Sequence, residues 1–309
     1  MYIFEKEQYV YDVGNVRIGG MPGENPTVLA GTIFYSGDKI VEDPDKGIFD
    51  RPTAESRIKA QEEMSDSTGN PALVHIFSES PDAIEEYIDF VSTVTDAPYL
   101  IDSTDSDVRI QGLRYSQEVG LLDKAIYNSL NISTNDEEIA ALKEIGHDCA
   151  IVLAFNPQDS SVAGRRAVLE EGAGDLEKGL LDLSKEIGID KPLIDTATTS
   201  IGSGAGSAVA FTFVSKVTFG HPTGSGMHNA PSSWRWIKDF ENKEIYRTCD
   251  AASNLIAQIL GADYLLYGPI ENAERVFPVV AMGDIFSAEA LSKEFGIEPV
   301  ENHPYRKLL

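Results

Sequence analysis

Residues 124–156 read KAIYNSLNISTNDEEIAALKEIGHDCAIVLAFN and contain one complete strand–helix–strand unit. The apolar runs 124–128 and 149–156 predict buried strands, and residues 136–145 between them predict a helix. Each strand run ends in an asparagine, Asn128 or Asn156. Strands that are buried on both faces and joined by a helix are typical of parallel sheets. This stretch therefore predicts an α/β fold.

The same alternation extends from this unit in both directions. Strands are predicted at residues 27–34, 72–77, 98–102, 124–128, 149–156, 192–195, 217–219 and 263–268. Helices are predicted at residues 53–68, 81–91, 105–119, 136–145, 175–187, 203–213, 246–260 and 287–295. Eight strands alternating with helices over about 240 residues are the number expected for a closed (β/α)8 TIM barrel. The alternative is an open doubly wound sheet, which more often divides into two domains at this length.

The first 26 residues have a different pattern. They are rich in β-forming residues, and Gly14-Asn15 is a two-residue turn signal. This pattern predicts a β-hairpin. We expect residues 1–26 to form a hairpin that caps one end of the barrel, and residues 27–309 to form the barrel itself.

Composition limits the partners. Among 309 residues, 50 acids against 25 bases give a formal charge of −25, which argues against nucleic-acid binding. No apolar run approaches the ~18 residues of a membrane span, and the start lacks the features of a signal peptide. Direct membrane insertion is therefore not expected, and a cytoplasmic location is. Cys149 and Cys249 are expected to be small buried hydrophobes.

Residues 219–233 read FGHPTGSGMHNAPSS, between the predicted strand at 216–219 and a predicted helix at 234–240. Three glycines and two prolines predict a shaped loop without regular structure. The loop would hold His228 and Asn229 beyond the carboxyl end of a strand, where ligands bind in parallel α/β folds. The alternative is a tight connection whose polar residues bind their own backbone and cap the helix.

Polar residues also end the other predicted strands. Those on strands three to six are Asp102 with Ser103, Asn128, Asn156 and Asp195. They could be turn formers or helix caps. Because all strands of a barrel end at one mouth, we instead expect them to surround a single pocket. Carboxylates and amides suit a planar neutral heterocycle rich in N–H and C=O groups, such as a pterin.

Several kinds of catalytic site have no signal in the sequence. The five histidines form no HxH or HxxxH pair, so a catalytic metal is not expected. The phosphate-binding pattern G-x-x-x-x-G-K-[ST] and the nucleophile pattern G-x-S-x-G do not occur.

Six segments together resemble one known family. They are GTIFY at 31–35, KGIFDR at 46–51, LIDS at 100–103, AIYNSLN at 125–131, IVLAFN at 151–156 and GMHNAPS at 226–232. The chain resembles the H subunit of tetrahydromethanopterin S-methyltransferase over about residues 1–300. Bacterial relatives in this family move methyl groups between tetrahydrofolate and a corrinoid protein.

The resemblance implies a pterin-binding barrel of the type found in dihydropteroate synthase. In that group, residues matching Asp102, Asn128 and Asp195 hold the pteridine ring. The residue matching Asn229 approaches N5 of the pterin, which makes Asn229 the expected catalytic residue. Asn156, Ser103 and His228 are the remaining expected pterin contacts.

The resemblance also implies a reaction. The expected enzyme moves a methyl group between the cobalt of a corrinoid protein and N5 of a tetrahydropterin, with tetrahydrofolate favoured. One alternative is the tetrahydromethanopterin-specific subunit of a membrane methyltransferase complex. Another is a scaffold that binds pterin and corrinoid protein without turnover. The corrinoid would be supplied by a soluble partner protein, and relatives pair as homodimers through barrel helices.

Overall fold

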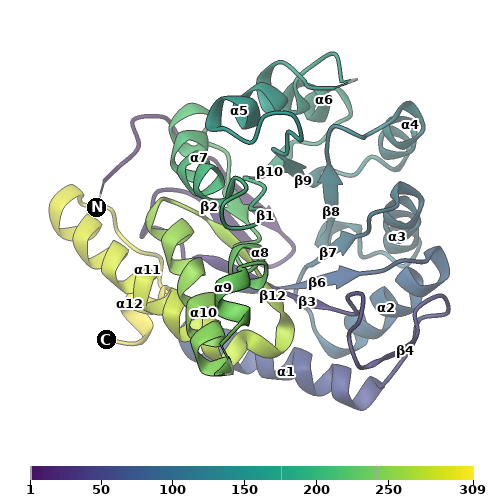
Figure 1. The fold of residues 1–309 in the computed structure, drawn as a ribbon, viewed down its shortest axis with the longest axis horizontal. Helices are drawn as coiled ribbons and strands as arrows, with labels where there is room; N and C mark the ends of the chain where they lie inside the picture. The colour runs from purple at the N-terminus through teal and green to yellow at the C-terminus, as the bar shows by residue number, and fades with distance from the viewer. Residues whose placement is uncertain (1, 175, 241) are drawn as a thin grey trace.

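Eight parallel strands close into one barrel, with helices arranged around it (Figure 1). The structure, a computed structural model, describes residues 2–174, 176–240 and 242–309. Around the barrel the strand order is β3, β6, β7, β8, β9, β10, β11 and β12, and β12 pairs with β3 to close the ring. The closed ring confirms the predicted TIM barrel and excludes the open sheet.

The barrel strands are β3 (Val28–Ile33), β6 (Ala72–Phe77), β7 (Tyr99–Asp102), β8 (Ala125–Leu130), β9 (Cys149–Leu153), β10 (Lys191–Asp195), β11 (Thr223–Ser225) and β12 (Tyr264–Pro269). The helices are α1 (Arg51–Thr68), α2 (Pro81–Val94), α3 (Ser106–Glu118), α4 (Asp136–Ile145), α5 (Val162–Glu170), α6 (Leu180–Glu186), α7 (Ala205–Thr218), α8 (Asn229–Ser232), α9 (Arg235–Lys238), α10 (Lys243–Ile259), α11 (Ala273–Phe295) and α12 (Pro304–Lys307). A small antiparallel pair, β4 (Val41–Asp43) and β5 (Ile48–Phe49), precedes α1. None of the described helices is both long enough and apolar enough to cross a membrane.

Helix α4 shows how local sequence sets these elements. The side chain of Asn135 accepts a hydrogen bond from the backbone N–H of Glu138, which caps the first turn. Gly146 ends the helix in the left-handed conformation, with φ of 69°, and its N–H bonds the carbonyl of Leu142. The helix therefore has the bounds that the sequence predicts.

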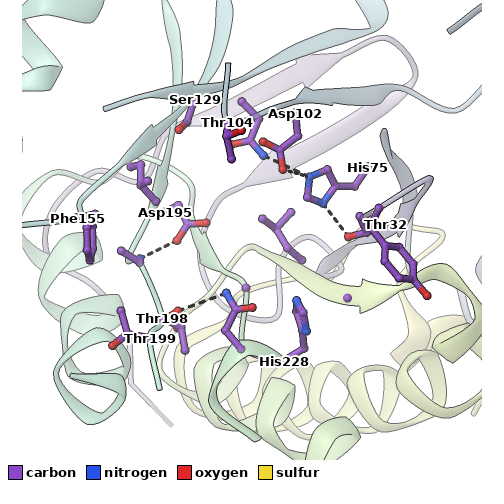
Figure 2. A pocket seen from close by; sticks show the side chains of 18 of the residues that line it. Thr32, His75, Asp102, Thr104, Ser129, Phe155, Asp195, Thr198, Thr199 and His228 are labelled. Carbon is purple, nitrogen blue, oxygen red and sulfur yellow. Dashed lines mark hydrogen bonds and ion pairs between the residues drawn. The ribbon is translucent and has the colours of Figure 1, made fainter. Parts of the chain in front are cut away.

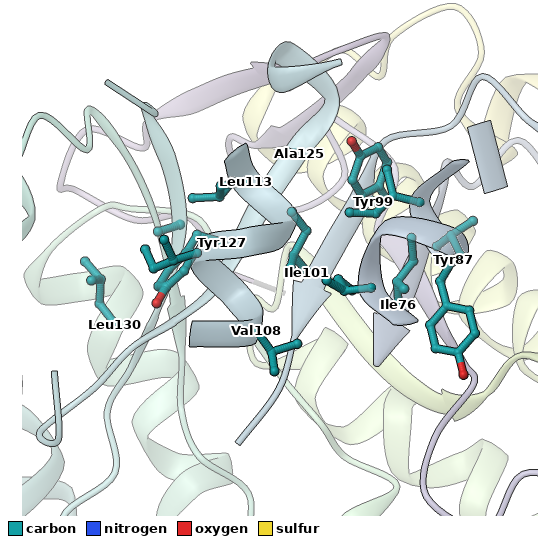
Figure 3. Packing of buried hydrophobic residues seen from close by; sticks show 14 of the residues in the cluster. Ile76, Tyr87, Tyr99, Ile101, Val108, Leu113, Ala125, Tyr127 and Leu130 are labelled. Atoms are coloured by element: carbon teal, nitrogen blue, oxygen red, sulfur yellow. The ribbon is translucent and has the colours of Figure 1, made fainter. Parts of the chain in front are cut away.

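Helix α3 illustrates how the barrel is covered. It packs its buried face, which includes Val108 and Leu113, against Ile101 of β7 and Tyr127 of β8 (Figure 3). The Gly112 position is close to β7, because a Cβ there would lie 2.7 Å from Cγ2 of Ile101. Apolar burial of this kind contributes about 25 cal/mol per Å2 and holds each helix against its strands.

The predicted N-terminal hairpin is present as β1 (Val10–Val13) and β2 (Val16–Gly19), joined at Gly14-Asn15. Its buried residues Val13, Val16 and Ile18 join an apolar cluster with residues of β3, β6, β7, β8, β9, β10 and β12. Strand structure does not extend over residues 2–9. The division of the chain at residue 26 stays a prediction.

The seventh strand is not where the sequence predicts it. Residues 216–218 are the last turn of α7, and the strand is β11, inside the segment predicted to be irregular. Strand β11 is only three residues long, and a Cβ on its Gly224 would lie 2.3 Å from the carbonyl oxygen of Tyr264 on β12. Such a short strand with a central glycine contains no run of apolar residues. The end of the preceding helix does contain one, so the seventh strand was predicted there instead.

Several helices also differ from the prediction. Helix α5 is absent from the predicted set, and α11 begins at Ala273, well before residue 287. Pro278 lies inside α11. Because proline usually marks a helix boundary, the first part of this helix was not predicted. The helix predicted at 175–187 is observed as α6, and its predicted start at Asp175 lies outside the described residues.

A buried ion pair lies at the end of the barrel where the strands begin, and it links several elements there. Lys216 Nζ lies 2.8 and 2.7 Å from the two carboxylate oxygens of Asp263 and donates to the carbonyl of Gly20 at 3.2 Å. The same carboxylate accepts the backbone N–H of Thr223 at 2.8 Å. Burial raises the pKa of Asp263, and the lysine opposes that shift. The pair therefore joins α7, β11, β12 and the segment after the hairpin.

Replacing Asp263 by Ala should lower the free energy of unfolding by about 3–5 kcal/mol, because Lys216 would be left buried without its partner. Urea denaturation measures the change. Glu289→Ala, which cuts the surface ion pair to Lys293, is the matched control and should change stability little. Equal effects of the two substitutions would contradict this account of the buried pair.

Candidate active site

A pocket of about 800 Å3 opens at the carboxyl ends of the barrel strands (Figure 2). Six of the residues predicted from the sequence line it: Asp102, Ser103, Asn128, Asp195, His228 and Asn229. They come from β7, β8, β10 and the segment that follows β11, so residues far apart in the chain share one cavity. Leu153, Phe155 and Leu266 add apolar surface to its wall.

Asp195 is the buried carboxylate of this pocket, at the end of β10. Its Oδ1 accepts the backbone N–H of Ala197 at 2.7 Å and the hydroxyl of Ser225 at 3.2 Å. Its Oδ2 has no hydrogen bond to any described residue. Burial raises the pKa of Asp195 to about 6, against the two hydrogen bonds, which lower it. Asp195 is therefore mostly ionised at neutral pH, with one oxygen available to a ligand.

The loop after Asp195 is held by a buried arginine. Ala197 has a φ of 57°, a conformation that costs a non-glycine residue about 1–2 kcal/mol. Arg165, on α5, donates to the carbonyls of Thr196 at 2.8 Å and Ala197 at 3.1 Å. These bonds fix the loop in the shape that aims the Ala197 N–H at the Asp195 carboxylate.

A second carboxylate, Asp102, is oriented by a histidine. His75 Nε2 lies 2.7 Å from Asp102 Oδ2, and His75 Nδ1 lies 2.9 Å from the Thr32 hydroxyl (Figure 2). A neutral His75 that donates through Nε2 and accepts through Nδ1 satisfies both contacts. The Asn128 amide nitrogen lies 3.4 Å from His75 Nε2. The three strands β6, β7 and β8 thus place His75, Asp102 and Asn128 side by side.

Asn229 and His228 form the opposite wall, at the start of α8. The exposed Asn229 side chain donates to the carbonyl of Thr198 at 3.4 Å. The ring of His228 packs against Gly268, where a Cβ would lie 2.7 Å from Cγ of the histidine. Burial lowers the pKa of His228 to about 4, so this imidazole is neutral at physiological pH.

Asn156 is not among the residues that line the pocket. Strand β9 ends at Leu153, and the Asn156 side chain accepts the backbone N–H groups of Gln158 at 3.0 Å and Asp159 at 3.1 Å. It behaves as the turn former that the sequence left open as an alternative. Its assignment as a pterin contact stays a prediction.

Sequence reasoning missed three residues that shape the site: His75, Ser225 and Arg165. His75 is a polar residue inside the otherwise apolar run 72–77, and that interruption was its available signal. Ser225 lies on the strand that was misplaced, and Arg165 lies on the helix that was not predicted. Among the described residues, no group of three or more His, Cys, Asp or Glu side chains is placed to hold a metal ion.

Comparison with solved structures identifies the fold class. Dihydropteroate synthase from Yersinia pestis, in a sulfonamide complex, aligns with a TM-score of 0.63 at 11% identity, covering 91% of this chain and 100% of that one. The Xanthomonas albilineans dihydropteroate synthase in complex with 7,8-dihydropteroate aligns with a TM-score of 0.59 at 13% identity, covering 90% and 98%. At such identities the likeness concerns the fold alone, which is that of the dihydropteroate synthase barrel.

Sequence comparison identifies the family. The family described as "Tetrahydromethanopterin S-methyltransferase MtrH subunit" matches residues 6–300. The H subunit of tetrahydromethanopterin S-methyltransferase from Methanothermobacter thermautotrophicus is 53% identical, and the H subunit of the putative methyltransferase mtx from Methanosarcina mazei is 49% identical, each over the full length of both chains. This chain therefore belongs to the MtrH family of methyltransferase subunits, which confirms the resemblance seen in the sequence.

Ser225→Ala should raise the pKa of Asp195 above its value of about 6, because the hydroxyl stabilises the ionised carboxylate. An infrared or carbon-13 NMR titration of the carboxyl group measures it. Ser232→Ala, at another residue that lines the pocket, is the control and should leave the titration unchanged. A wild-type value near 3.8, or no shift in Ser225→Ala, would refute this account of the Asp195 environment.

Proposed function

We propose that this chain binds N5-methyl-tetrahydromethanopterin in the barrel pocket and passes its methyl group to the cobalt of a corrinoid held by a partner protein. The observation that carries the proposal is the convergence of Asp102, Asn128, Asp195 and Asn229 on one cavity. The residues of this cavity offer hydrogen-bond donors and acceptors to the polar edges of a pterin ring.

The carboxylates suit the pyrimidine edge of a pterin. That edge presents a ring N–H beside an amino group, and a carboxylate accepts hydrogen bonds from both. Asp195 Oδ2 and Asp102 Oδ1 have no bond to any described residue, while the other oxygen of each carboxylate is fixed by the protein. The two groups are therefore oriented before a ligand binds, which lowers the entropic cost of binding.

Asn229 is suited to the reacting end of the ring. The N5–methyl bond breaks with difficulty, because an amine anion is a poor leaving group. Positive charge or a proton at N5 lowers this barrier, and a hydrogen bond from a fixed amide favours that state. Figure 2 shows His228 across the pocket from Asp102, and Asn229, the next residue in the chain, lines the same pocket. A ring held by the carboxylates would therefore present another edge to Asn229.

The choice of pterin follows the relatives. Sequence reasoning alone favours tetrahydrofolate, but relatives at 53% and 52% identity carry the name of a tetrahydromethanopterin methyltransferase. We therefore infer that tetrahydromethanopterin is the methyl carrier of this chain. Those relatives are named as subunits, so we place this chain in a multi-subunit assembly that supplies the corrinoid.

Asn229→Ala should lower the rate of methyl transfer about 100-fold, because one hydrogen bond that forms fully in the transition state is lost. Pterin affinity should be largely kept, because the carboxylates provide most of the binding. Single-turnover assays that follow methyl transfer from N5-methyl-tetrahydromethanopterin to cob(I)alamin measure the rate, and calorimetry measures the affinity.

Asn156→Ala is the matched control for this variant, since Asn156 is not a lining residue. It should leave both rate and affinity unchanged. If Asn229→Ala transfers methyl groups as fast as the wild type, Asn229 has no part in the mechanism.

Asp195→Ala should weaken pterin binding by about 2–3 kcal/mol through the loss of charge-assisted hydrogen bonds. Because burial raises the pKa of Asp195 to about 6, the carboxylate forms above that pH. Wild-type affinity should therefore be highest above pH 6 and fall as the pH drops through it. Calorimetry between pH 5 and 8 tests both points, with Asp190→Ala, at an exposed residue, as the control. Equal affinity of Asp195→Ala and wild type would remove Asp195 from ring binding.

A further inference from the structure

A second cavity adjoins the pocket. It has a volume of about 780 Å3 and lies between α8, α9, α10 and the start of α11, which stand together in Figure 1. Ser232 and Tyr246 line both cavities. The two cavities therefore adjoin at these two residues.

The second cavity is basic in a strongly acidic chain. Four cationic side chains line it, from Lys238, Lys243, Arg247 and Arg275, and we call it the basic groove. The chain has 50 acids and 25 bases, so random placement would give a surplus of acids here. Among the residues that the structure describes, the one acid in the lining is Glu271.

The cations of the basic groove are largely available. Lys238 and Lys243 are exposed, and their side chains make no ion pair or hydrogen bond with any described residue. Among the described residues, Arg275 donates to the amide oxygen of Asn272, at 2.8 Å, and Arg247 pairs with Glu244 at the surface. An anion in the groove would therefore meet at least two uncommitted ammonium groups.

Glu271 does not neutralise these cations. One of its carboxylate oxygens accepts the hydroxyl of Tyr35 at 3.3 Å, and the other lies 3.8 Å from Arg57. Both partners belong to the segment from β3 to α1, and neither lines the basic groove. Among the described residues, the lining of the groove therefore carries four cationic side chains and one carboxylate.

The pocket itself offers no such charge. Among its described lining residues, the one arginine or lysine is Arg109, whose guanidinium donates to the Ser103 carbonyl at 2.7 Å, to Tyr127 at 3.0 Å and to Glu138 at 2.9 Å. Asp102 and Asp195 make the pocket unfavourable for an anion. A substrate that carries both a neutral ring and an anionic group must place them in different cavities.

We propose that the basic groove binds the anionic end of the substrate whose ring occupies the pocket. The groups it would take are phosphate or carboxylate, both of which form charge-assisted hydrogen bonds with lysine and arginine. This inference rests on the proposed function, because it assumes a pterin ring in the pocket. It adds that the affinity for the substrate depends on the anionic tail of the substrate and on the cationic side chains of the basic groove, outside the pocket that binds the ring.

The test measures how tightly two forms of the protein bind pterins with an anionic tail and a pterin without one. Calorimetry compares the wild type with the double variant Lys243→Gln/Arg247→Gln. The ligands are N5-methyl-tetrahydromethanopterin, whose tail carries phosphate, N5-methyl-tetrahydrofolate, whose tail carries carboxylates, and the tail-less N5-methyl-6,7-dimethyltetrahydropterin. The double variant should bind the phosphate-tailed or the carboxylate-tailed pterin about tenfold more weakly and the tail-less pterin unchanged. Because the tetrahydromethanopterin tail also ends in carboxylates, weakening confined to this pterin identifies phosphate as the anion that the groove recognises, whereas equal weakening of both tailed pterins identifies carboxylate.

Lys185→Gln is the control, because it removes a charge on α6, outside both cavities. It should change no affinity. Equal weakening of tailed and tail-less pterins by the double variant, or no weakening of either, would overturn the inference while leaving the proposed function intact. Failure of the wild type to bind any of the three pterins would overturn both.

Discussion

Closure of eight parallel strands is the constraint on which this site depends. In a closed parallel barrel every strand ends at the same mouth, so the side chain at each end must face its neighbours or the cavity. Asp102 and Asp195 are brought together in this way, although they belong to strands far apart in the chain. Their placement brings a cost, because the buried Asp195 loses hydration. The Ala197 N–H and the Ser225 hydroxyl offset part of it, and Arg165 keeps the loop in position.

Whether a strand could be predicted from the sequence depended on how that strand is buried. Seven strands were located because both of their faces are covered, which leaves a run of apolar residues. Asp102, Asn128 and Asp195 were proposed as site residues because they end such runs. The short β11 has no run, so it was misplaced, and with it Ser225. Asn156 looked equivalent in sequence, but β9 ends before it, and its side chain turns back to the loop.

Other features depend on contacts that no local pattern reveals. His75 faces the pocket, yet nothing in residues 72–77 shows that Thr32 and Asp102 will lie beside it. The basic groove likewise draws its cations from α9, α10 and α11, and their sequence shows only scattered lysines and arginines. The mouth of the barrel thus has two regions of opposite charge, with the carboxylates in the pocket and the cations beside it. The predicted homodimer and cytoplasmic location remain predictions.

The pairing of β3 with β12 has a consequence for biosynthesis. Leu29 and Leu265 are neighbours in the closed ring, although most of the chain lies between them. During translation the ring cannot shut until β12 has left the ribosome, and the earlier strands wait with an open edge that can pair wrongly. Most of the residues that would bind a ligand are therefore synthesised long before the ring closes and the pocket forms.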